Sequence, residues 1–285
     1  MACGIIIIDK PAGWTSQDVA AKLRGVFHER RIGHGGTLDP MATGVLPIFV
    51  GRATRGVEFF ESAEKEYVAG LKLGVETNTQ DTTGEVLAEQ PVSVSREQLE
   101  AVLRTFLGPQ EQIPPKYSAV KIGGKKLYEL ARQGKTVERK ARKIEILELE
   151  LLDGAAADWQ IRVRCSKGTY VRTLCHDIGQ ALGCGGCMSS LRRTKAGCYD
   201  LGQSISMEAP ESRLLPVDSM FADSPAYTVH ENQLKAVYNG AAVKAGALAD
   251  GTYRVYGPDG TFLLLGRAEK GQLKTIKSFF EVSKP

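Results

Sequence analysis

The sequence predicts an α+β fold, in which helices flank a mixed, mainly antiparallel sheet and a small β-rich module follows. Two observations carry this prediction. Strand-type segments alternate with amphipathic helices, but not in the strict β-α-β order of a parallel sheet. Near residue 222 the pattern changes to short strands separated by glycines. The chain has 285 residues, of which 42% are hydrophobic and 25% charged, so it can bury a core of its own.

The first elements are a strand and a helix. Four consecutive isoleucines at 5–8 are typical of a buried strand. Residues 15–16 begin a helix that has one apolar face, and the glycines of 33–36 predict a flexible loop. Residues 45–50 are apolar, but Pro47 argues against a central strand there, because proline has no N–H to donate.

The middle of the chain adds further strands and two helices. Ser95 and Gln98 form a capping box that opens a helix, which Gly108 closes. Apolar and polar residues alternate over 159–165, which predicts a half-buried strand, and a helix over 169–182 follows. Strands are also expected at 66–73 and 144–152, and a turn-rich loop at 78–84.

We expect two domains, over residues 1–222 and 223–285. In the second, a short helix over 232–238 and a hairpin turn at 256–260 separate short strands. No segment approaches the ~18 apolar residues of a membrane span, and the N-terminus lacks the basic start of a signal peptide. The sequence therefore predicts a cytoplasmic protein without membrane association.

The six cysteines are expected to be reduced thiols, because disulfides are rare in cytosolic chains of this size. Cys184 and Cys187 have metal-type spacing, and Cys175, His176 and Cys198 lie near them in the sequence. Structural zinc usually takes two such pairs, and the chain has no second one. We therefore expect no metal, and a zinc site stays a minor alternative.

A basic stripe interrupts an otherwise nearly neutral chain. Between Lys116 and Lys143 there are ten Lys or Arg residues and two acids, while the formal net charge of the whole chain is only +4. Tyr117, Tyr128 and paired glycines are interspersed with these charges. The pattern favours a surface that faces phosphates over a solvated helix face.

The stretch 33–44 is the most informative for chemistry. Asp39 precedes Pro40, which keeps it out of the helical region, and glycines on both sides let a ligand approach the backbone. Taken alone, such an aspartate is more often a structural turn former. Motifs for nucleotide phosphates, serine hydrolases and zinc proteases are absent.

Four other residues carry two interpretations each. Tyr67 and Tyr170 can stack on a base or belong to the core. Arg172 can pair with a carboxylate or a phosphate, or lie in solvent. His34 can bind a ligand within its glycine-rich loop or be an ordinary exposed histidine.

A set of motifs closely resembles the TruB family of tRNA pseudouridine synthases. These motifs occur in the family's order and span nearly the whole chain. Two small departures are Gly35, where threonine is more common, and Met41, where leucine is more common. The matching segments are 8–16, 33–47, 65–67, 114–119, 124–128, 168–172 and 191–194.

The resemblance implies that uridine 55 in the T-loop of tRNA is isomerised to pseudouridine. The N1–C1′ bond breaks, the uracil turns, and C5 bonds to C1′, without a metal or organic cofactor. The catalytic domain would then carry an RNA-gripping thumb at 113–143. The C-terminal module would be a PUA-like domain that contacts the acceptor-stem side of tRNA. A monomer that needs no protein partner is expected.

The resemblance also assigns roles to the candidate residues. Asp39 would be the nucleophile, and Arg172 would pair with it, lower its pKa and keep it ionised. Tyr67 would stack on the target base and serve as a base during rearrangement. The remaining roles concern binding: Tyr170 and Leu191 would line the uracil pocket, His34 would occupy the space left by the flipped nucleotide, and Lys10 would support the catalytic loop.

Three alternatives stay open at this point. A guide-RNA-dependent pseudouridine synthase would need protein partners and a guide RNA, and the basic stripe argues against it. A tRNA-folding chaperone would act mainly by binding, a role that can coexist with catalysis. A metal-binding module built on Cys184 and Cys187 is the third.

The thumb assignment makes a prediction about salt. Replacing Lys125 and Lys126 by glutamine should weaken tRNA binding and reduce the slope of log K against log salt by about 1.5, because two fewer counterions are released. Titrations of tRNA binding between low and moderate salt measure this slope. An unchanged slope would exclude the thumb assignment.

Overall fold

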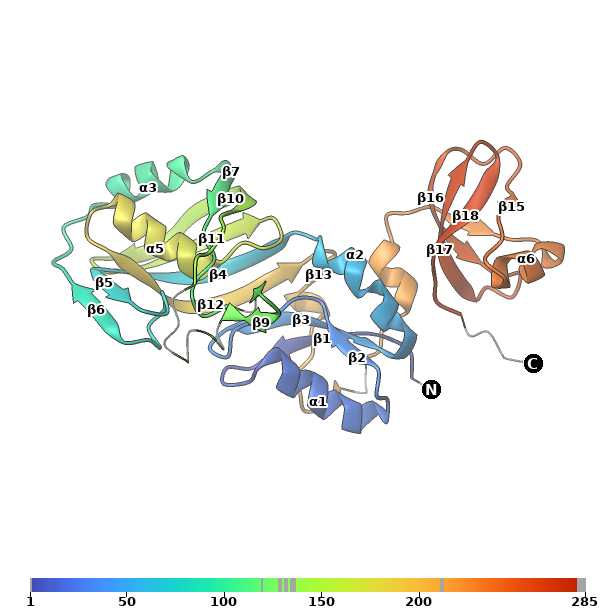
Figure 1. The fold of residues 1–285 in the computed structure, drawn as a ribbon, viewed down its shortest axis with the longest axis horizontal. Coiled ribbons are helices and arrows are strands. Elements are labelled where there is room, and N and C mark those ends of the chain that lie inside the picture. Colours follow the sequence, from blue (N-terminus) through green and yellow to red (C-terminus); the bar gives the residue numbers. More distant parts are fainter. Residues whose placement is uncertain are drawn as a thin grey trace.

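A nine-stranded sheet runs through the larger part of the molecule, as Figure 1 shows for the computed structural model. The structure describes residues 2–118, 120–127, 130, 133, 137–210 and 213–280. The strand order is β1-β3-β12-β4-β11-β10-β7, with β2 paired to β3 and β13 paired to β12. The strands are β1 (Gly4–Lys10), β2 (Ile32–His34), β3 (Thr43–Val50), β4 (Lys65–Leu73), β7 (Gly108–Gln112), β10 (Arg142–Ala155), β11 (Asp158–Cys165), β12 (Gly186–Ala196) and β13 (Tyr199–Asp200).

Helices cover this sheet in places that match the expected architecture. Helix α3 contacts β10, α5 contacts β12, and α1 contacts β2. All the strand pairs of the sheet are antiparallel except β12 with β3, so the predicted fold class is confirmed. The helices of the larger part are α1 (Ser16–Phe27), α2 (Val57–Glu61), α3 (Arg96–Thr105) and α5 (Val171–Ala181), with short 3₁₀ turns at Gly51–Gly56, Leu201–Gln203 and Val217–Phe221.

The isoleucine run forms β1 and is buried on both faces of the sheet. Ile6 and Ile8 belong to the main core cluster, whereas Ile5 and Ile7 belong to a second cluster on the opposite face. None of the four is more than 1% exposed. A strand covered on both sides can be apolar at every position, which explains why the run does not alternate.

The capping signals place both predicted helix starts correctly. Thr15 accepts from the Asp18 N–H and the Asp18 side chain returns the bond, which starts α1. Ser95 and Gln98 do the same for α3. The predicted end of α3 is wrong, because the helix stops at Thr105 and Gly108 already begins β7.

Pro47 lies inside a real strand, so the expectation drawn from it is wrong. It faces Ile7 of β1, but the Ile7 carbonyl points away and accepts from the Ile205 N–H at 2.9 Å. The β1–β3 pairing therefore needs no N–H from residue 47. On the other side, the Pro47 carbonyl accepts from the Gly35 N–H at 2.9 Å.

Several strands were not expected, among them β2 and β12. The glycine-rich segment at 33–36 is partly ordered as β2, which pairs with β3. Strand β12 lies in the centre of the sheet although it carries Arg192 and Arg193. The polar composition of β12 argues against a buried strand in sequence analysis, because a sequence pattern does not show which distant groups bind a buried charge.

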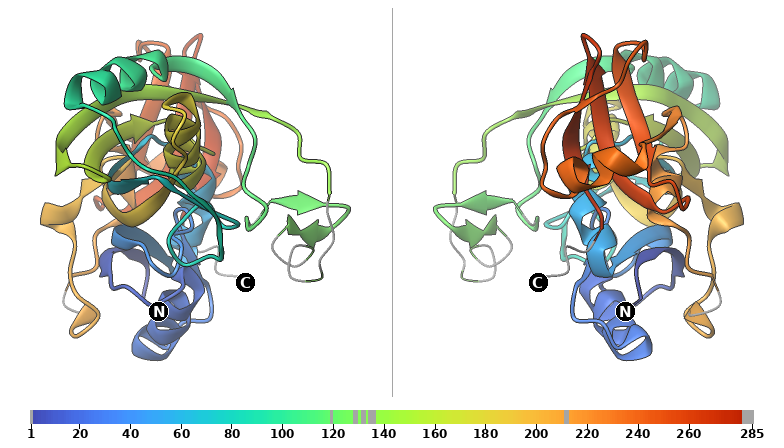
Figure 2. Two further views of the ribbon diagram at one scale, coloured as in Figure 1. Left: turned by 90° about the vertical axis from the view of Figure 1, so that its left-hand side faces the viewer. Right: turned by 90° about the vertical axis from the view of Figure 1, so that its right-hand side faces the viewer.

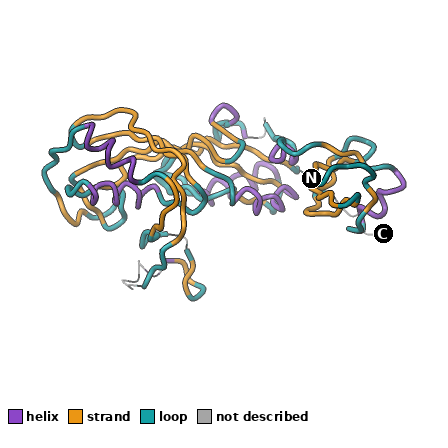
Figure 3. Tube along the Cα trace, turned by 90° about the horizontal axis from the view of Figure 1, so that it is seen from above, coloured by secondary structure: helices purple, strands orange, loops and turns teal. Residues whose placement is uncertain are grey.

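The basic stripe extends away from the sheet. Residues 113–118 leave β7, and the two short strands β8 (Lys121–Ile122) and β9 (Lys125–Lys126) pair at a distance from the body. Figures 2 and 3 show this hairpin projecting to one side of the molecule. Ala119 and Tyr128 lie outside the described residues. A second small hairpin, β5 (Val75–Thr77) and β6 (Val86–Glu89), follows β4.

The C-terminal part is a separate five-stranded sheet in the order β14-β16-β17-β18-β15. The predicted hairpin turn joins β16 to β17. Phe262 and Phe279 pack against Phe221 of the larger part. None of the described helices is long and apolar enough to cross a membrane. The elements are β14 (Ala226–Thr228), a 3₁₀ turn at Glu231–Gln233, α6 (Leu234–Tyr238), β15 (Val243–Lys244), β16 (Gly251–Tyr256), β17 (Phe262–Glu269) and β18 (Gln272–Ser278).

One glycine is required where β3 and β12 meet. Gly44 has φ +101°, and a Cβ there would lie 2.2 Å from the Arg193 carbonyl oxygen. Gly108 has a similar φ, +91°, but a Cβ there would have nothing within 4 Å. Alanine at Gly108 would therefore introduce backbone strain alone, whereas alanine at Gly44 would introduce both strain and steric overlap.

Alanine at these two glycines should have unequal effects. Gly108→Ala should lower the free energy of unfolding by about 1–2 kcal/mol through left-handed strain alone. Gly44→Ala should cost about 1–3 kcal/mol more, because the methyl group displaces β12. Urea unfolding followed by circular dichroism measures both variants, and equal losses would contradict the close approach.

Candidate active site

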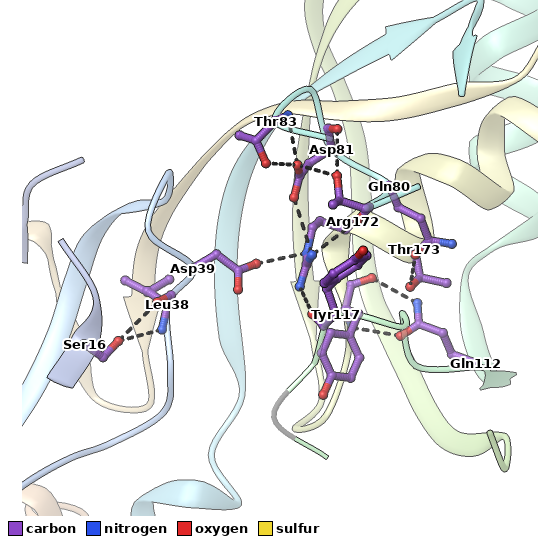
Figure 4. Close-up of polar contacts among 12 residues, drawn as sticks. Ser16, Leu38, Asp39, Gln80, Asp81, Thr83, Gln112, Tyr117, Arg172 and Thr173 are labelled. Atoms are coloured by element: carbon purple, nitrogen blue, oxygen red, sulfur yellow. Dashed lines mark hydrogen bonds and ion pairs between the residues drawn. The ribbon is translucent and has the colours of Figure 1, made fainter. Parts of the chain in front are cut away.

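Asp39 lies in the turn between β2 and β3, and the start of α1 holds the residue before it. The Ser16 hydroxyl accepts from the Leu38 N–H at 2.9 Å and donates to the Leu38 carbonyl at 3.3 Å (Figure 4). Ser16 and Leu38 are both 2% exposed. The Ala42 N–H donates to the Asp39 carbonyl at 3.0 Å and closes the turn. The backbone at Asp39 is thus fixed from both sides.

Lys10 is a buried support for the same turn. It ends β1, is fully buried, and its Nζ donates to the carbonyls of Trp14 at 2.7 Å, Pro11 at 2.9 Å and Pro40 at 3.3 Å. Burial lowers the pKa of Lys10 to about 8, and the nearby Asp39 opposes that shift. One ammonium group therefore ties the loop after β1 to the residue that follows Asp39.

The predicted ion pair between Arg172 and Asp39 is present. Arg172 lies in the first turn of α5, and its Nε is 3.0 Å from Asp39 Oδ2. Its Nη2 donates to the Tyr117 carbonyl at 2.9 Å, and its Nη1 to the Thr79 carbonyl at 3.2 Å and to Asp81 Oδ2 at 3.4 Å. The guanidinium is 7% exposed and shared between two carboxylates, as Figure 4 shows.

Asp81 is a site residue that the sequence analysis missed. It is 4% exposed, in the turn between β5 and β6. Its Oδ1 accepts from the hydroxyl groups of Thr79 at 2.8 Å and Thr83 at 2.5 Å, and from the Thr83 N–H at 3.0 Å. In sequence it resembles any turn-forming aspartate, so only its position opposite Arg172 distinguishes it.

Burial has the largest effect on the pKa of Asp39. The pKa of Asp39 is raised, because burial outweighs the attraction of Arg172. Asp81 raises it further, whereas Arg172 and Lys10 lower it. Arg172 therefore lowers the pKa of Asp39 as expected, but burial has the larger effect and the net shift is upward. The Asp39 side chain stays 36% exposed, so a substrate can reach it.

A glutamine clamps the N-terminus of α5. Gln112, 4% exposed at the end of β7, accepts from the Tyr170 N–H at 2.8 Å and donates to the Tyr170 carbonyl at 3.1 Å. The Thr173 hydroxyl donates to the Gln80 side chain at 2.8 Å. The helix that carries Arg172 is thereby fixed both to the base of the basic hairpin and to the turn of Asp81.

Tyr67 and Leu191 lie on adjacent central strands. Tyr67 faces Arg193 across the β4–β12 pair, and Leu191 faces Ala69. Tyr67 and Leu191 are each 9% exposed. Burial raises the pKa of Tyr67, and the charge of Asp39 adds to this rise. The negative charge of Asp39 is therefore close enough to disfavour ionisation of the phenol, which stays protonated at neutral pH.

His34 ends β2 near the same turn. The Gln17 amide nitrogen lies 3.1 Å from His34 Nε2, and the buried Nδ1 finds no partner among the described residues. Burial and the charge of Arg193 lower the pKa of His34, so the ring is neutral at pH 7.

The cysteines do not form the zinc site considered as an alternative. In the part of the chain that the structure describes, no three His, Cys, Asp or Glu side chains gather around one point. Cys184 donates to the Gly185 carbonyl. Burial raises the pKa of the Cys187 thiol to about 11 and raises that of Cys175 as well. Protonated thiols are poor metal ligands.

Three family models match the chain one after another. The family model for the N-terminal domain of TruB family pseudouridylate synthase matches residues 24–171. Two models follow it, the tRNA pseudouridylate synthase B C-terminal domain over 172–215 and the C-terminal domain of pseudouridine synthase II TruB over 225–276.

Curated relatives match almost from end to end. A protein named tRNA pseudouridine synthase B from Syntrophomonas wolfei is 45% identical, with 96% of each chain covered. Another of that name from Francisella tularensis subsp. novicida is 42% identical and covers 97% of this chain and 94% of its own. A crystal structure of a Cbf5-Nop10-Gar1 complex contains a chain with TM-score 0.73 and 28% identity, covering 97% of this chain and 85% of that one. The chain therefore belongs to the TruB family of pseudouridine synthases.

Proposed function

We propose that this pseudouridine synthase isomerises uridine 55 in the T-loop of tRNA, with Asp39 as its nucleophile. The observation that carries the proposal is that the Asp39 carboxylate is both paired with an arginine and partly exposed to solvent. One Asp39 oxygen is bound by the buried Arg172, yet the side chain remains 36% exposed. Relatives at 42–45% identity are named for tRNA, which supports tRNA as the substrate.

The reaction needs a base removed from its stack. Extruding a base from a folded RNA loop costs a few kcal/mol. The N1–C1′ bond then breaks, the uracil turns, and C5 bonds to C1′. C5 gives up its proton and N1 gains one, so the overall change is an isomerisation. Asp39 takes part in breaking the bond, and Arg172, anchored by Asp81, aims it.

The remaining residues form the base pocket in this proposal. Tyr67 stacks on the uracil and, once its hydroxyl group has released its proton, acts as a base. Tyr170 and Leu191 line the pocket. His34 enters the T-loop where the flipped base was. Lys10 supports the turn of Asp39, which agrees with its three bonds to backbone carbonyls.

The binding surface extends beyond the pocket. We assign tRNA contacts to the basic hairpin at 113–143 and to the PUA-like domain over 223–285, which would meet the acceptor-stem side. We further propose that the protein acts as a monomer, without protein partners, in the cytoplasm. The guide-dependent alternative is not favoured, since the Cbf5 chain is only 28% identical.

Loss of the carboxylate should separate catalysis from binding. Asp39→Asn should abolish tritium release from tRNA transcript labelled at uridine C5, while tRNA affinity stays within about twofold, because the change removes one charge and little surface. Wild type should release close to one equivalent per tRNA. Asp153→Asn, on the exposed face of β10, is the matched control and should release tritium as wild type does.

Other outcomes of this experiment would contradict the proposal. If Asp39→Asn lost tRNA binding, Asp39 would be structural. If wild type released nothing from well-folded transcript, a guide RNA or a binding-only role would replace the proposed reaction. If Asp39→Asn kept all cellular function, the chaperone role would be the dominant one.

The raised pKa of Asp39 predicts the acid limit of activity. The nucleophile must be ionised, so kcat/KM should fall as pH falls through its raised pKa, above the ordinary aspartate value of about 4. Asp81→Asn removes one cause of the rise and should move this limb to lower pH. Asp177→Asn removes a half-buried carboxyl on α5 and should leave the limb in place. If the acidic limb of the kcat/KM profile lay at the same pH in Asp81→Asn as in wild type, the assignment of this limb to Asp39 would be contradicted.

A further inference from the structure

Arg193 is a buried cation that the proposed reaction does not use. It is 1% exposed and lies in the C-terminal half of β12. No carboxylate among the described residues forms an ion pair with it. Its Nε donates to the Val45 carbonyl at 2.7 Å, and its Nη2 to the Gly36 carbonyl at 3.2 Å. An unpaired buried charge is costly, so each of its hydrogen bonds matters.

The remaining side-chain partner of Arg193 is Tyr67. The two residues are directly opposite each other on β12 and β4, so their side chains lie on the same face. The Arg193 guanidinium lies within hydrogen-bonding reach of the Tyr67 hydroxyl, and its charge lowers the pKa of the phenol against the larger effect of burial. A guanidinium can only donate, so the phenol oxygen accepts from it. This bond leaves the Tyr67 proton free to point elsewhere.

Other charged or titratable groups also face Tyr67, but they have different effects. From β11, Cys165 is buried and its pKa is raised to about 11, so the thiol is neutral. Lys65 on β4 donates its Nζ to the carbonyls of Ala63 and Glu61 at 2.6 and 3.1 Å. Asp39 opposes ionisation of the phenol. Among these groups, Arg193 alone both bonds the hydroxyl and favours its ionised form.

We propose that Arg193 is a positioning residue for turnover, acting through the hydroxyl group of Tyr67. Its bond to the phenol oxygen fixes the orientation of the ring and makes the hydroxyl readier to release its proton. Its bond to Gly36 fixes the loop three residues before Asp39. One guanidinium therefore fixes the position of Tyr67 relative to Asp39. The inference rests on the proposed function in giving Tyr67 a part in the reaction.

The contact can be measured without activity. The protein has nine tyrosines, and labelling them with 3-fluorotyrosine gives ¹⁹F resonances, of which Tyr67→Phe removes one. That resonance should titrate at a pH higher by about 1 in Arg193→Met, since an adjacent cation is lost. Arg193→Lys should shift it less. Arg192→Met is the matched control, because Arg192 binds Asp9 instead and faces Val68.

Turnover is measured on the same variants. Single-turnover tritium release should slow roughly 100-fold in Arg193→Met, as expected for a misplaced reacting group, with tRNA affinity unchanged and partial rescue in Arg193→Lys. A Tyr67 resonance that titrates as in wild type would overturn the inference. So would a shifted resonance with a wild-type rate.

Failure of folding and failure of the proposed function remain distinguishable. If the other eight tyrosine resonances of Arg193→Met lose their dispersion, the variant is misfolded and Arg193→Lys decides the question by the same two measurements. If wild type releases no tritium, the proposed function is rejected. A shifted titration would in that case still support the bond between Arg193 and Tyr67.

Discussion

The shared guanidinium of Arg172 is the interaction on which the site depends. It contacts the Asp39 carboxylate, the Asp81 carboxylate and two backbone carbonyls, and it is almost fully buried. Three segments far apart in the sequence, the turn before β3, the turn between β5 and β6, and the start of the basic hairpin, meet at this one group. Because the charge is desolvated, removing any partner would leave a costly unpaired group.

Buried positive charge is a second organising feature. Lys10, Lys65 and Arg193 are all buried, and each is satisfied mainly by backbone carbonyls. Each ties its own strand to a neighbouring loop or strand, and Lys10 and Arg193 bond to the loop that carries Asp39. Carbonyl oxygens compensate the charges without neutralising them, so the region keeps a positive field. A substrate rich in phosphates suits such a field.

Sequence reasoning succeeded where a local physical rule decides the structure. The capping boxes at Thr15 and Ser95, the isoleucine run and the 256–260 turn all follow from short-range chemistry. It failed at Pro47 and at β12, where the outcome depended on which neighbour's carbonyl pointed away and on distant partners for Arg193. The family resemblance supplied Asp39 and Arg172, which residue patterns alone left undecided.

By itself, the sequence determined the fold class, the order of most elements, the basic stripe and the membership of a pseudouridine synthase family. Only the tertiary structure decided how the charges combine: that Asp81 shares Arg172 with Asp39, that burial raises the pKa of Asp39 despite its arginine, and that Arg193 faces Tyr67. The physical reason is that desolvation and pairing depend on distances between segments that are remote in the chain. Capping and periodicity depend only on neighbours a few residues away.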